Sequence, residues 1–234
     1  MTPAGLARRD DDLRELMDDP ACDPERLRAT LERFAIVNRL VAAWGTVYRT
    51  RIRPALMSGG GPVRLLDIGC GGGDVIRDLV GRARADGFDV SAVGIDPDER
   101  SIAVARAARP IRGIEYRRID STDLAATGER FDVVLSSHVL HHLTHTELRT
   151  VLDDSARLAT RLAVHSDIAR SSLAYAAYAV GITPLAPGSF LRTDGLRSIR
   201  RSWTPDELSA LVPAGWRVEQ PAPFRLLAVH RAGA

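Results

Sequence analysis

Leu65-Leu66-Asp67-Ile68-Gly69-Cys70-Gly71-Gly72-Gly73-Asp74 is the segment of this chain that most strongly constrains its fold. Its apolar residues predict a buried strand, its glycines predict a turn, and Asp74 begins a helical pattern that continues to Val80. Glycine lets the backbone adopt positive φ and approach a ligand closely, and the start of a helix presents unpaired N–H groups. The segment therefore predicts a strand-turn-helix that binds a nucleotide.

The spacing of the glycines separates two classes of nucleotide-binding turn. Dinucleotide dehydrogenases use the pattern G-x-G-x-x-G, but the third position after Gly71 is Asp74. Gly69, Gly71 and Gly73 instead form G-x-G-x-G, and the acidic Asp67 lies inside the strand. The pattern therefore argues against a site for NAD.

Strand and helix patterns alternate along the rest of the chain. Strands are expected at 63–68, 90–95, 114–119, 131–136 and 161–166, helices at 74–85, 98–108 and 145–159, and two further strands at 216–219 and 224–229. Such alternation predicts a parallel sheet with helices on both faces. Thr144 and Thr204 each stand three residues before a glutamate, which predicts a capping box at the start of two helices.

Residues 1–57 precede this alternation and are expected to form a helical cap. Apolar residues recur there at steps of three and four, which predicts one apolar face of a long or kinked helix. They are Leu27, Leu31, Phe34, Val37, Val41, Trp44 and Tyr48. A glycine-rich connector at 58–62 then leads into the second unit, residues 58–234.

Composition narrows the class of protein. A hydrophobic fraction of 45% and a charged fraction of 26% are ordinary for a soluble globular chain, and a net charge of +2 does not indicate a nucleic-acid-binding protein. Two cysteines are too few for a disulfide framework, and the six histidines show no metal-ligand spacing, so we expect no metal. The N-terminus lacks an apolar leader, and no uninterrupted apolar stretch reaches the length of a membrane helix, so we expect a cytoplasmic protein without membrane contact.

Four ordered motifs resemble those of the class I S-adenosylmethionine (SAM) methyltransferases. They are Leu65–Asp74 (motif I), Val93–Asp98 (second strand with an acidic end), Arg117–Ser121 (third strand end) and Phe131–Leu143 (fourth strand and its loop). The resemblance implies a doubly wound, Rossmann-like α/β fold with a seven-stranded, mostly parallel sheet, whose last two strands form an antiparallel hairpin. It also implies a SAM-dependent methyltransferase that releases S-adenosylhomocysteine (SAH).

The same resemblance assigns the cofactor site. Asp96 matches the carboxylate that binds the ribose diol, and Asp67 matches the acidic residue that reaches the methionine ammonium. Asp120 matches the acceptor for the adenine amine, with Ser121 offering a backbone N–H. The full set of expected cofactor-binding residues is Asp67, Gly69, Cys70, Gly71, Gly73, Asp96, Pro97, Asp120, Ser121 and Ser137.

Three histidines, His138, His141 and His142, follow the fourth strand. Methyl transfer needs an acceptor held in line with the methyl group, and a hydroxyl acceptor also needs a base, for which histidine with an unperturbed pKa of ~6.5 is suited. The small-molecule O-methyltransferases that the chain resembles carry a His-His pair here and an aspartate after the fifth strand, matched by Asp167. We expect His142 to be the base and Asp167 to orient it or to contact the acceptor. Alternatively, both adjacent histidines are structural, and which of them faces the acceptor stays open.

An insertion at about 170–203 follows the fifth strand, and in the resembled family this region and the N-terminal helices cover the acceptor. Tyr175 and Tyr178 among small alanines suggest a flat apolar pocket, although an aromatic stripe of this kind also packs helices. The arginine-rich loop expected at 194–205 is a candidate for binding an anionic group of the acceptor, or else is solvated or paired with acidic residues.

The chain as a whole is similar to methyltransferases found beside type III polyketide synthases in actinobacteria, and its histidine loop is similar to that of ubiquinone and menaquinone methyltransferases. This similarity implies O-methylation of a small phenolic or polyketide-like acceptor in secondary metabolism, by a monomer or homodimer. C-methylation of a quinol, and a SAM-binding protein without catalysis, are the alternatives.

Overall fold

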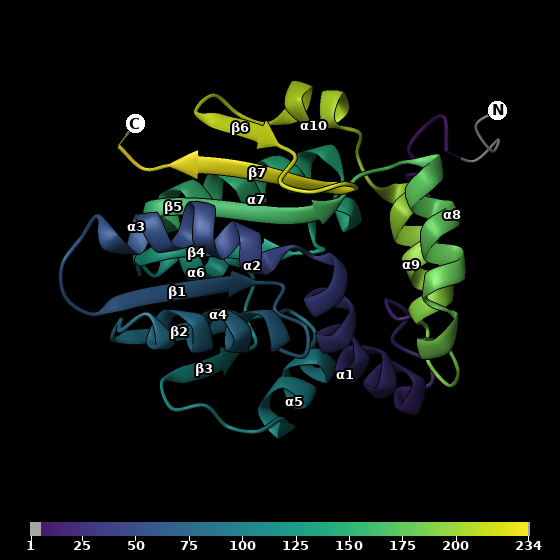
Figure 1. Ribbon diagram of the computed structural model, residues 1–234, viewed down its shortest axis with the longest axis horizontal. Helices are drawn as coiled ribbons and strands as arrows, with labels where there is room; N and C mark the ends of the chain where they lie inside the picture. Colours follow the sequence, from purple (N-terminus) through teal and green to yellow (C-terminus); the bar gives the residue numbers. More distant parts are fainter. Residues whose placement is uncertain (1–5, 234) are drawn as a thin grey trace.

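A central sheet organises the computed structural model, which describes residues 6–233 apart from the side chains of Leu40 and Val41. The strands follow the order β3-β2-β1-β4-β5-β7-β6 (Figure 1). They are β1 (Val63–Ile68), β2 (Val90–Ile95), β3 (Ile114–Arg117), β4 (Phe131–Ser137), β5 (Ala159–Ile168), β6 (Trp216–Glu219) and β7 (Arg225–Arg231). Strands β1 to β5 are parallel, whereas β7 is antiparallel to both β5 and β6. The predicted seven-stranded, mostly parallel α/β fold is confirmed.

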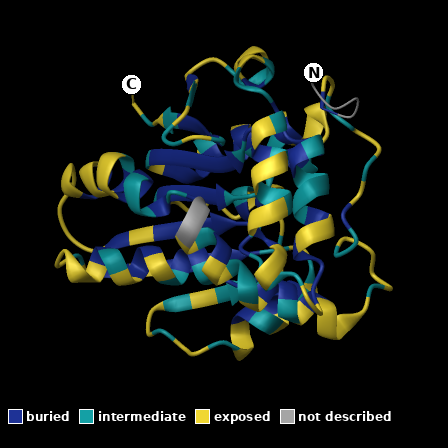
Figure 2. Cartoon of the chain, turned by 45° about the vertical axis from the view of Figure 1, so that its right-hand side comes forward, coloured by how far each residue is buried: buried dark blue, intermediate teal, exposed yellow. Residues whose placement is uncertain are grey.

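Two apolar layers cover the faces of this sheet. On one face, α2 (Trp44–Val47), α3 (Arg53–Met57) and α4 (Asp74–Ala85) pack on residues such as Leu65 and Val133. On the other face, α6 (Ser121–Ala126), α7 (His145–Leu158) and α10 (Pro205–Leu211) pack on residues such as Leu66 and Val134. Figure 2 shows the central strands mostly buried between these helices, whereas the edge strand β3 is partly exposed. Burial of both faces explains why the strand sequences are continuous apolar runs.

Most predicted elements of the sheet domain agree with the structure, including the capping boxes at Thr144 and Thr204. The third strand is an exception, since it was expected to run to residue 119. It pairs only with β2, whose last residue Ile95 lies opposite Arg117, so residues 118–119 have no strand to pair with. Helix α5 (Glu99–Ala107) follows β2 and packs beside β3 and the N-terminal helix.

The N-terminal region differs from the helical cap that the sequence predicts. Helix α1 (Pro24–Val41) begins only where Asp23 caps it and Pro24 supplies its first residue, and it ends before Ala43, which adopts φ 57°. The π-helical turn η1 (Tyr48–Ile52) joins α2 to α3. The expectation of helix is wrong for residues 6–23, which we call the strap, while residues 1–5 and the side chain of Val41 lie outside the described part of the chain.

The insertion after β5 consists of helices. They are α8 (Ser172–Gly181), the short 3₁₀ turn η3 (Thr183–Leu185) and α9 (Leu191–Arg201). The arginine-rich segment expected to be a loop is therefore mostly α9, because buried Leu191 and Ile199 give it an apolar side. In Figure 1, α1, α8 and α9 lie beyond the carboxyl ends of β1, β4 and β5, where open α/β sheets bind their ligands.

Candidate active site

The glycine turn between β1 and α4 has a backbone that only glycine fits. Gly69 and Gly73 have φ of +66° and +72°. A Cβ on Gly69 would lie 2.6 Å from Val139 Cγ2, and a Cβ on Gly73 would lie 2.5 Å from the Tyr116 hydroxyl. The turn is thus fixed both by its left-handed conformation and by close packing.

Asp67, in β1 just before this turn, is 1% exposed. Neither of its carboxylate oxygens has a hydrogen-bond partner among residues 6–233. Burial, and then the nearby Asp74 and Asp96, raise the pKa of Asp67 well above its ordinary value. A buried carboxylate without a partner is costly, so this position is built to meet a cation or a hydrogen-bond donor.

Asp96 lies at the end of β2 beside the same turn. Its Oδ2 accepts the Gly71 N–H at 3.0 Å and its Oδ1 accepts the Asp98 N–H at 2.9 Å. Burial raises its pKa. Each oxygen keeps a further lone pair, so the half-buried carboxylate is fixed in place and still able to accept hydrogen bonds from a ligand.

The other expected cofactor residues lie around this turn with varied partners. Asp120 is exposed and caps α6, while the Ser121 hydroxyl donates to Asp154, so only its backbone is free for a ligand. The Ser137 hydroxyl accepts from the Trp44 indole at 3.1 Å. Burial raises the pKa of the Cys70 thiol, so it is a packing group, and Pro97 is exposed.

His141 lies in the short 3₁₀ turn η2 (Leu140–His142) and is 1% exposed. Its Nδ1 is 2.8 Å from Asp167 Oδ1, its Nε2 is 3.1 Å from Glu15 Oε1, and its backbone N–H donates to Asp167 Oδ2. Burial opposes the charged form, but the two carboxylates outweigh it and raise the pKa of His141 to about 9. The ring is therefore a buried imidazolium between two carboxylates when the cluster holds no other cation.

His142 has the more open position, with a side chain that is 29% exposed. Its Nδ1 is 3.3 Å from Asp18 Oδ2, and its Nε2 is 3.6 Å from Glu15 Oε1. The structure thus pairs Asp167 with His141, and the expectation that Asp167 orients His142 is wrong. The two neighbouring rings differ in what their Nδ1 atoms face, because that of His141 meets Asp167 at the end of β5, whereas that of His142 meets Asp18 of the strap.

His138 and Arg225 form a second polar pair beside this cluster. Arg225 is 2% exposed, and its guanidinium contacts His138 Nε2 at 3.2 Å and the Ser166 hydroxyl at 2.9 Å. Burial, and then the Arg225 charge, lower the pKa of His138 to about 3, so the ring is neutral. Nothing in the sequence pattern indicated Arg225, since it lies on the last strand.

The strap brings two further residues that sequence reasoning missed, Glu15 and Asp18. Glu15 is buried and also accepts a hydrogen bond from the Ser198 hydroxyl. The only signal was an acidic segment far from the histidines in the chain. Because the strap has no regular structure, no periodicity could have placed these carboxylates against η2.

The arginines near the insertion are occupied by the chain itself. Arg201 donates to the His142 carbonyl, Arg197 to the Arg14 carbonyl, and Arg200 pairs with Asp10. Arg9 donates to the carbonyls of His141 and Leu143 and lies over the Trp203 ring. These arginines hold the strap against α9 and η2 rather than forming an open anion site.

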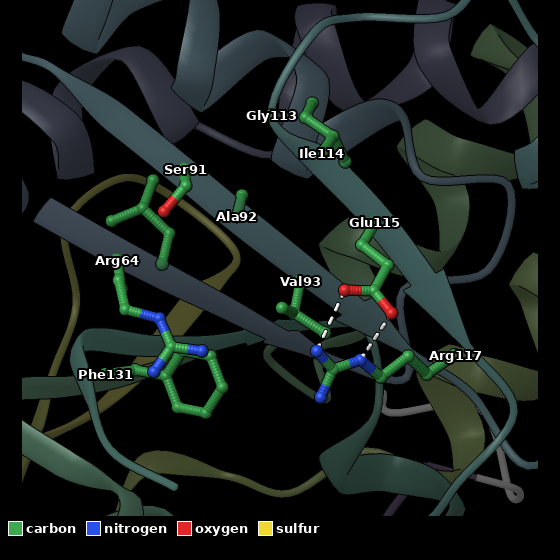
Figure 3. Close-up of a pocket in the computed structure, with 10 residues that line it drawn as sticks. Arg64, Ser91, Ala92, Val93, Gly113, Ile114, Glu115, Arg117 and Phe131 are labelled. Carbon is green, nitrogen blue, oxygen red and sulfur yellow. Dashed lines mark hydrogen bonds and ion pairs between the residues drawn. The ribbon is translucent and has the colours of Figure 1, made fainter.

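A separate hollow of about 240 Å³ lies on the sheet near the amino ends of β1 and β2 (Figure 3). Arg64 and Phe131 form one wall, and the ion pair of Glu115 with Arg117 forms the other. Its two arginines are paired, Arg117 with Glu115 and Arg64 with Glu129, and the hollow lies at the opposite end of β1 from the glycine turn. It is therefore not part of the candidate site.

Comparison with known proteins agrees with this geometry. Residues 65–161, from β1 into β5, match the family model described as a methyltransferase domain. The match covers less than half of the chain, whose sheet order and helix layers are those of the class I fold. Within the matched residues lie the glycine turn, Asp96 and the histidine cluster, whereas the strap and the insertion lie outside them. No helix of residues 6–233 is long and apolar enough to cross a membrane.

The curated relatives are similar over little more than a third of the chain. A ubiquinone biosynthesis O-methyltransferase of Rhizobium etli is 40% identical over 88 residues, which are 37% of this chain and 33% of the relative. One of Cereibacter sphaeroides is 47% identical over 83 residues, 35% of this chain and 31% of the relative. The chain thus spans about a third of the length of the curated relatives it matches.

Solved methyltransferase structures share the fold across most of the chain. The plantazolicin methyltransferase BpumL, in complex with a triazolic desmethylPZN analog and SAH, has a TM-score of 0.64 at 13% identity, over 87% of this chain and 90% of its own. The CurJ carbon methyltransferase has a TM-score of 0.61 at 19% identity, over 91% of this chain and 61% of its own. At such identities the likeness concerns the fold alone.

Proposed function

We propose that this protein is a SAM-dependent methyltransferase. The observation that carries the proposal is Asp67, a buried carboxylate without a partner among the described residues, directly before a glycine turn. The α-ammonium group of SAM supplies the donor that this carboxylate needs, whereas a nucleotide without a cation would leave it unpaired. The matched methyltransferase domain and the SAH in the BpumL structure support the same cofactor.

The remaining residues of the site fit the other parts of SAM. Asp96 offers free lone pairs to the two ribose hydroxyls, while its bonds to Gly71 and Asp98 keep it in position. Asp120 and the Ser121 backbone, at the start of α6, are assigned to the adenine amine and ring. Bound SAM supplies an activated methyl group, so the protein must position the acceptor and manage its proton.

We place the acceptor at the histidine cluster and propose O-methylation of a small phenolic or polyketide-like compound. His142 is the proposed base, because His141 is enclosed between Asp167 and Glu15 while the His142 ring is partly open. The names of the curated relatives, which are ubiquinone biosynthesis O-methyltransferases, support an oxygen acceptor.

Titration calorimetry with SAH tests the cofactor assignment. We expect one equivalent of SAH to bind the parent protein, and Asp96→Ala to weaken binding at least tenfold because the ribose diol loses its charged acceptor. Folded protein that binds no SAH, or an Asp96→Ala variant with unchanged affinity, contradicts the proposed site.

A screen of phenolic acceptors then tests the reaction. The ¹H and ¹³C NMR shifts of the transferred methyl group separate an O-methyl from a C-methyl product. We expect an O-methyl ether, and a loss of turnover of roughly 10²–10⁴ in His142→Ala with SAH affinity retained. A C-methyl product overturns the O-methylation proposal but keeps the cofactor assignment.

A further inference from the structure

Three side chains from distant parts of the chain bring potential metal ligands together. Each of Glu15, His141 and His142 offers one ligand atom, and these atoms all lie within 4.8 Å of one another. Glu15 Oε1 is 3.1 Å from the Nε2 atom of His141 and 3.6 Å from the Nε2 atom of His142. Ligands at ~2.0–2.1 Å from a tetrahedral metal are separated by roughly 3.3 Å, and the two measured distances lie on either side of that value.

The Nδ1 atoms of both imidazole rings face carboxylates, as the second ring nitrogens of metal-binding histidines do. His141 Nδ1 is 2.8 Å from Asp167 Oδ1, and His142 Nδ1 is 3.3 Å from Asp18 Oδ2. Metal-binding histidines almost always donate their second ring N–H to a carboxylate or carbonyl, which fixes the tautomer and turns the other nitrogen to the metal. Here two separate carboxylates, from β5 and from the strap, turn both Nε2 atoms toward the same oxygen of Glu15. An isolated His–Glu ion pair requires no such matched arrangement.

The charge of the cluster also fits a cation. Glu15, Asp18 and Asp167 supply three carboxylates. Two arginines oppose them, Arg201, whose Nη1 is 3.9 Å from Asp18, and Arg225, whose charge favours the ionised form of Asp167, so the carboxylates still outnumber the arginines. Glu15 and His141 have side chains only 4% and 1% exposed, whereas His142 is 29% exposed. The three ligands are therefore preorganised in a buried site that stays open on the side of His142.

We propose that Glu15, His141 and His142 bind one divalent transition-metal ion, with Asp167 and Asp18 orienting the two imidazoles. Two imidazole nitrogens and one carboxylate suit Zn²⁺ and ions of similar preference such as Co²⁺, whereas Mg²⁺ prefers oxygen ligands. Three protein ligands leave the fourth position of a tetrahedral ion free for water or for an oxygen of the acceptor.

Metal binding by this site does not depend on the proposed methyl transfer, but its use in the reaction does. A cation here would bind the acceptor hydroxyl and favour its ionised form, and His142 Nε2 would then be a ligand instead of a base. Loss of turnover in His142→Ala fits both roles, so the test must measure binding of the metal itself.

The experiment uses the full chain, treated with a chelator and then titrated with Co²⁺ and Zn²⁺. We expect one equivalent of Co²⁺ with the visible absorption of a four-coordinate site, displaced by Zn²⁺ and not by Mg²⁺. A chelating indicator gives the affinities. Glu15→Gln and His142→Ala should weaken Zn²⁺ binding more than tenfold, and Asp167→Asn by about 10–100-fold.

His230→Ala is the matched control, because His230 is a histidine of β7 outside the cluster, and its ring contacts the Gly215 carbonyl and the Trp216 ring. It should bind Zn²⁺ like the parent. Glu15→Gln keeps the size of the side chain, and a cooperative thermal melt shows that each variant is folded. Absence of stoichiometric Co²⁺ binding, or equal binding by the parent and Glu15→Gln, overturns the proposal. SAH calorimetry on the same samples separates this outcome from failure of the cofactor site.

Discussion

Asp67 is a residue that destabilises the free protein and that only a bound ligand can satisfy. Its side chain is buried next to two other acidic residues, Asp74 and Asp96, and has no partner among the described residues. Asp74 receives a hydrogen bond from Asn38 and Asp96 from two backbone N–H groups, so Asp67 alone of the three depends on a ligand. Such locally unfavourable residues are typical of functional sites.

We expect Asp67→Asn to separate ligand binding from stability. SAH affinity should fall by about 10–100-fold, since hydrogen bonds to charged groups contribute about 1.5–3 kcal/mol. The free variant should melt at or above the temperature of the parent. The folded state raises the pKa of Asp67, so the parent protein loses stability as the pH rises from the pKa of the unfolded chain toward that of the folded one. The gain in thermal stability of Asp67→Asn over the parent should therefore be largest at neutral pH and smallest in acid.

Thermal melts with and without SAH, at several pH values, measure both effects. Asp89→Asn is the control, because Asp89 is exposed. A variant that binds SAH like the parent would show that Asp67 does not meet the cofactor.

Gly73 is expected to be indispensable for two separable reasons. Gly73→Ala must place a side chain at φ +72° and within 2.5 Å of the Tyr116 hydroxyl. Gly87→Ala carries only the first cost, since Gly87 has φ +87° and open space around it. We expect about 1–2 kcal/mol of destabilisation in Gly87→Ala and more in Gly73→Ala, with SAH binding lost only in the latter. Chemical denaturation measures the free energy of unfolding of both variants. Equal losses of stability in Gly73→Ala and Gly87→Ala would show that contact with Tyr116 adds no cost.

For single residues, the sequence predicts a place in the site only where the local pattern around the residue determines its position. Asp67, the glycines and Asp96 stand at strand ends, so their clustering at the edge of a parallel sheet follows from local pattern. Glu15 and Arg225 do not, because each reaches the histidines through a contact more than 80 residues away in the chain. The pairing of Asp167 was assigned to the wrong ring because the sequence does not specify the orientation of a 3₁₀ turn.

Among the elements, the strap depends mainly on side chains, since a single backbone hydrogen bond in the described part of the chain, from the Asp10 N–H to the Arg200 carbonyl, links it to α9. Asp194 of α9 accepts the N–H groups of Leu16 and Met17 at 2.8 and 3.0 Å, replacing the backbone partners that a helix or strand would provide. Burial raises the pKa of Asp194 to about 6, so at neutral pH it is ionised and accepts both bonds as a carboxylate.

Asp194→Ala should therefore release the strap without unfolding the domain. The two lost bonds leave the N–H groups of Leu16 and Met17 without their acceptor. The free energy needed to detach the strap from α9 should fall by about 1–2 kcal/mol in total. Trypsin should then cleave after the exposed Arg14 about 5–30 times faster, because cleavage follows the population of the open form. Asp12→Ala, at an exposed strap residue, is the control. Equal cleavage rates for parent and Asp194→Ala would show that other contacts hold the strap.

The same reasoning explains which elements could be predicted. Strands β1 and β2 and helices α4 and α7 have continuous apolar or periodic patterns with clear caps, and their predicted bounds agree with the structure to within a residue. The strap has neither, since its conformation depends on Asp194, Arg9 and Arg201. The arginines of α9 suggested a solvated or anion-binding loop because their carbonyl partners lie on segments distant in the sequence.

In the whole molecule, the strap connects the two halves of the site. Glu15 and Asp18 contact the histidine cluster, while Met17 and Asp19 accept hydrogen bonds from Arg100. Arg100 also pairs with Asp98, whose N–H is bound by Asp96. A chain of direct contacts thus runs from the expected ribose site, through α5 and the strap, to the expected acceptor site.

This connection predicts that cofactor binding and closure of the strap are coupled. SAH bound at Asp96 should order the 96–100 segment and slow cleavage after Arg14, and Arg100→Ala should abolish most of that protection. The SAH affinity of Arg100→Ala should differ only a few-fold from that of the parent. The coupling is reciprocal, so the factor by which SAH favours strap closure equals the factor by which strap closure favours SAH binding. Arg106→Ala, which removes another arginine of α5 paired with exposed Glu99, is the matched control. If SAH protects Arg14 equally in the parent and in Arg100→Ala, the two halves of the site are coupled through the sheet instead of the strap.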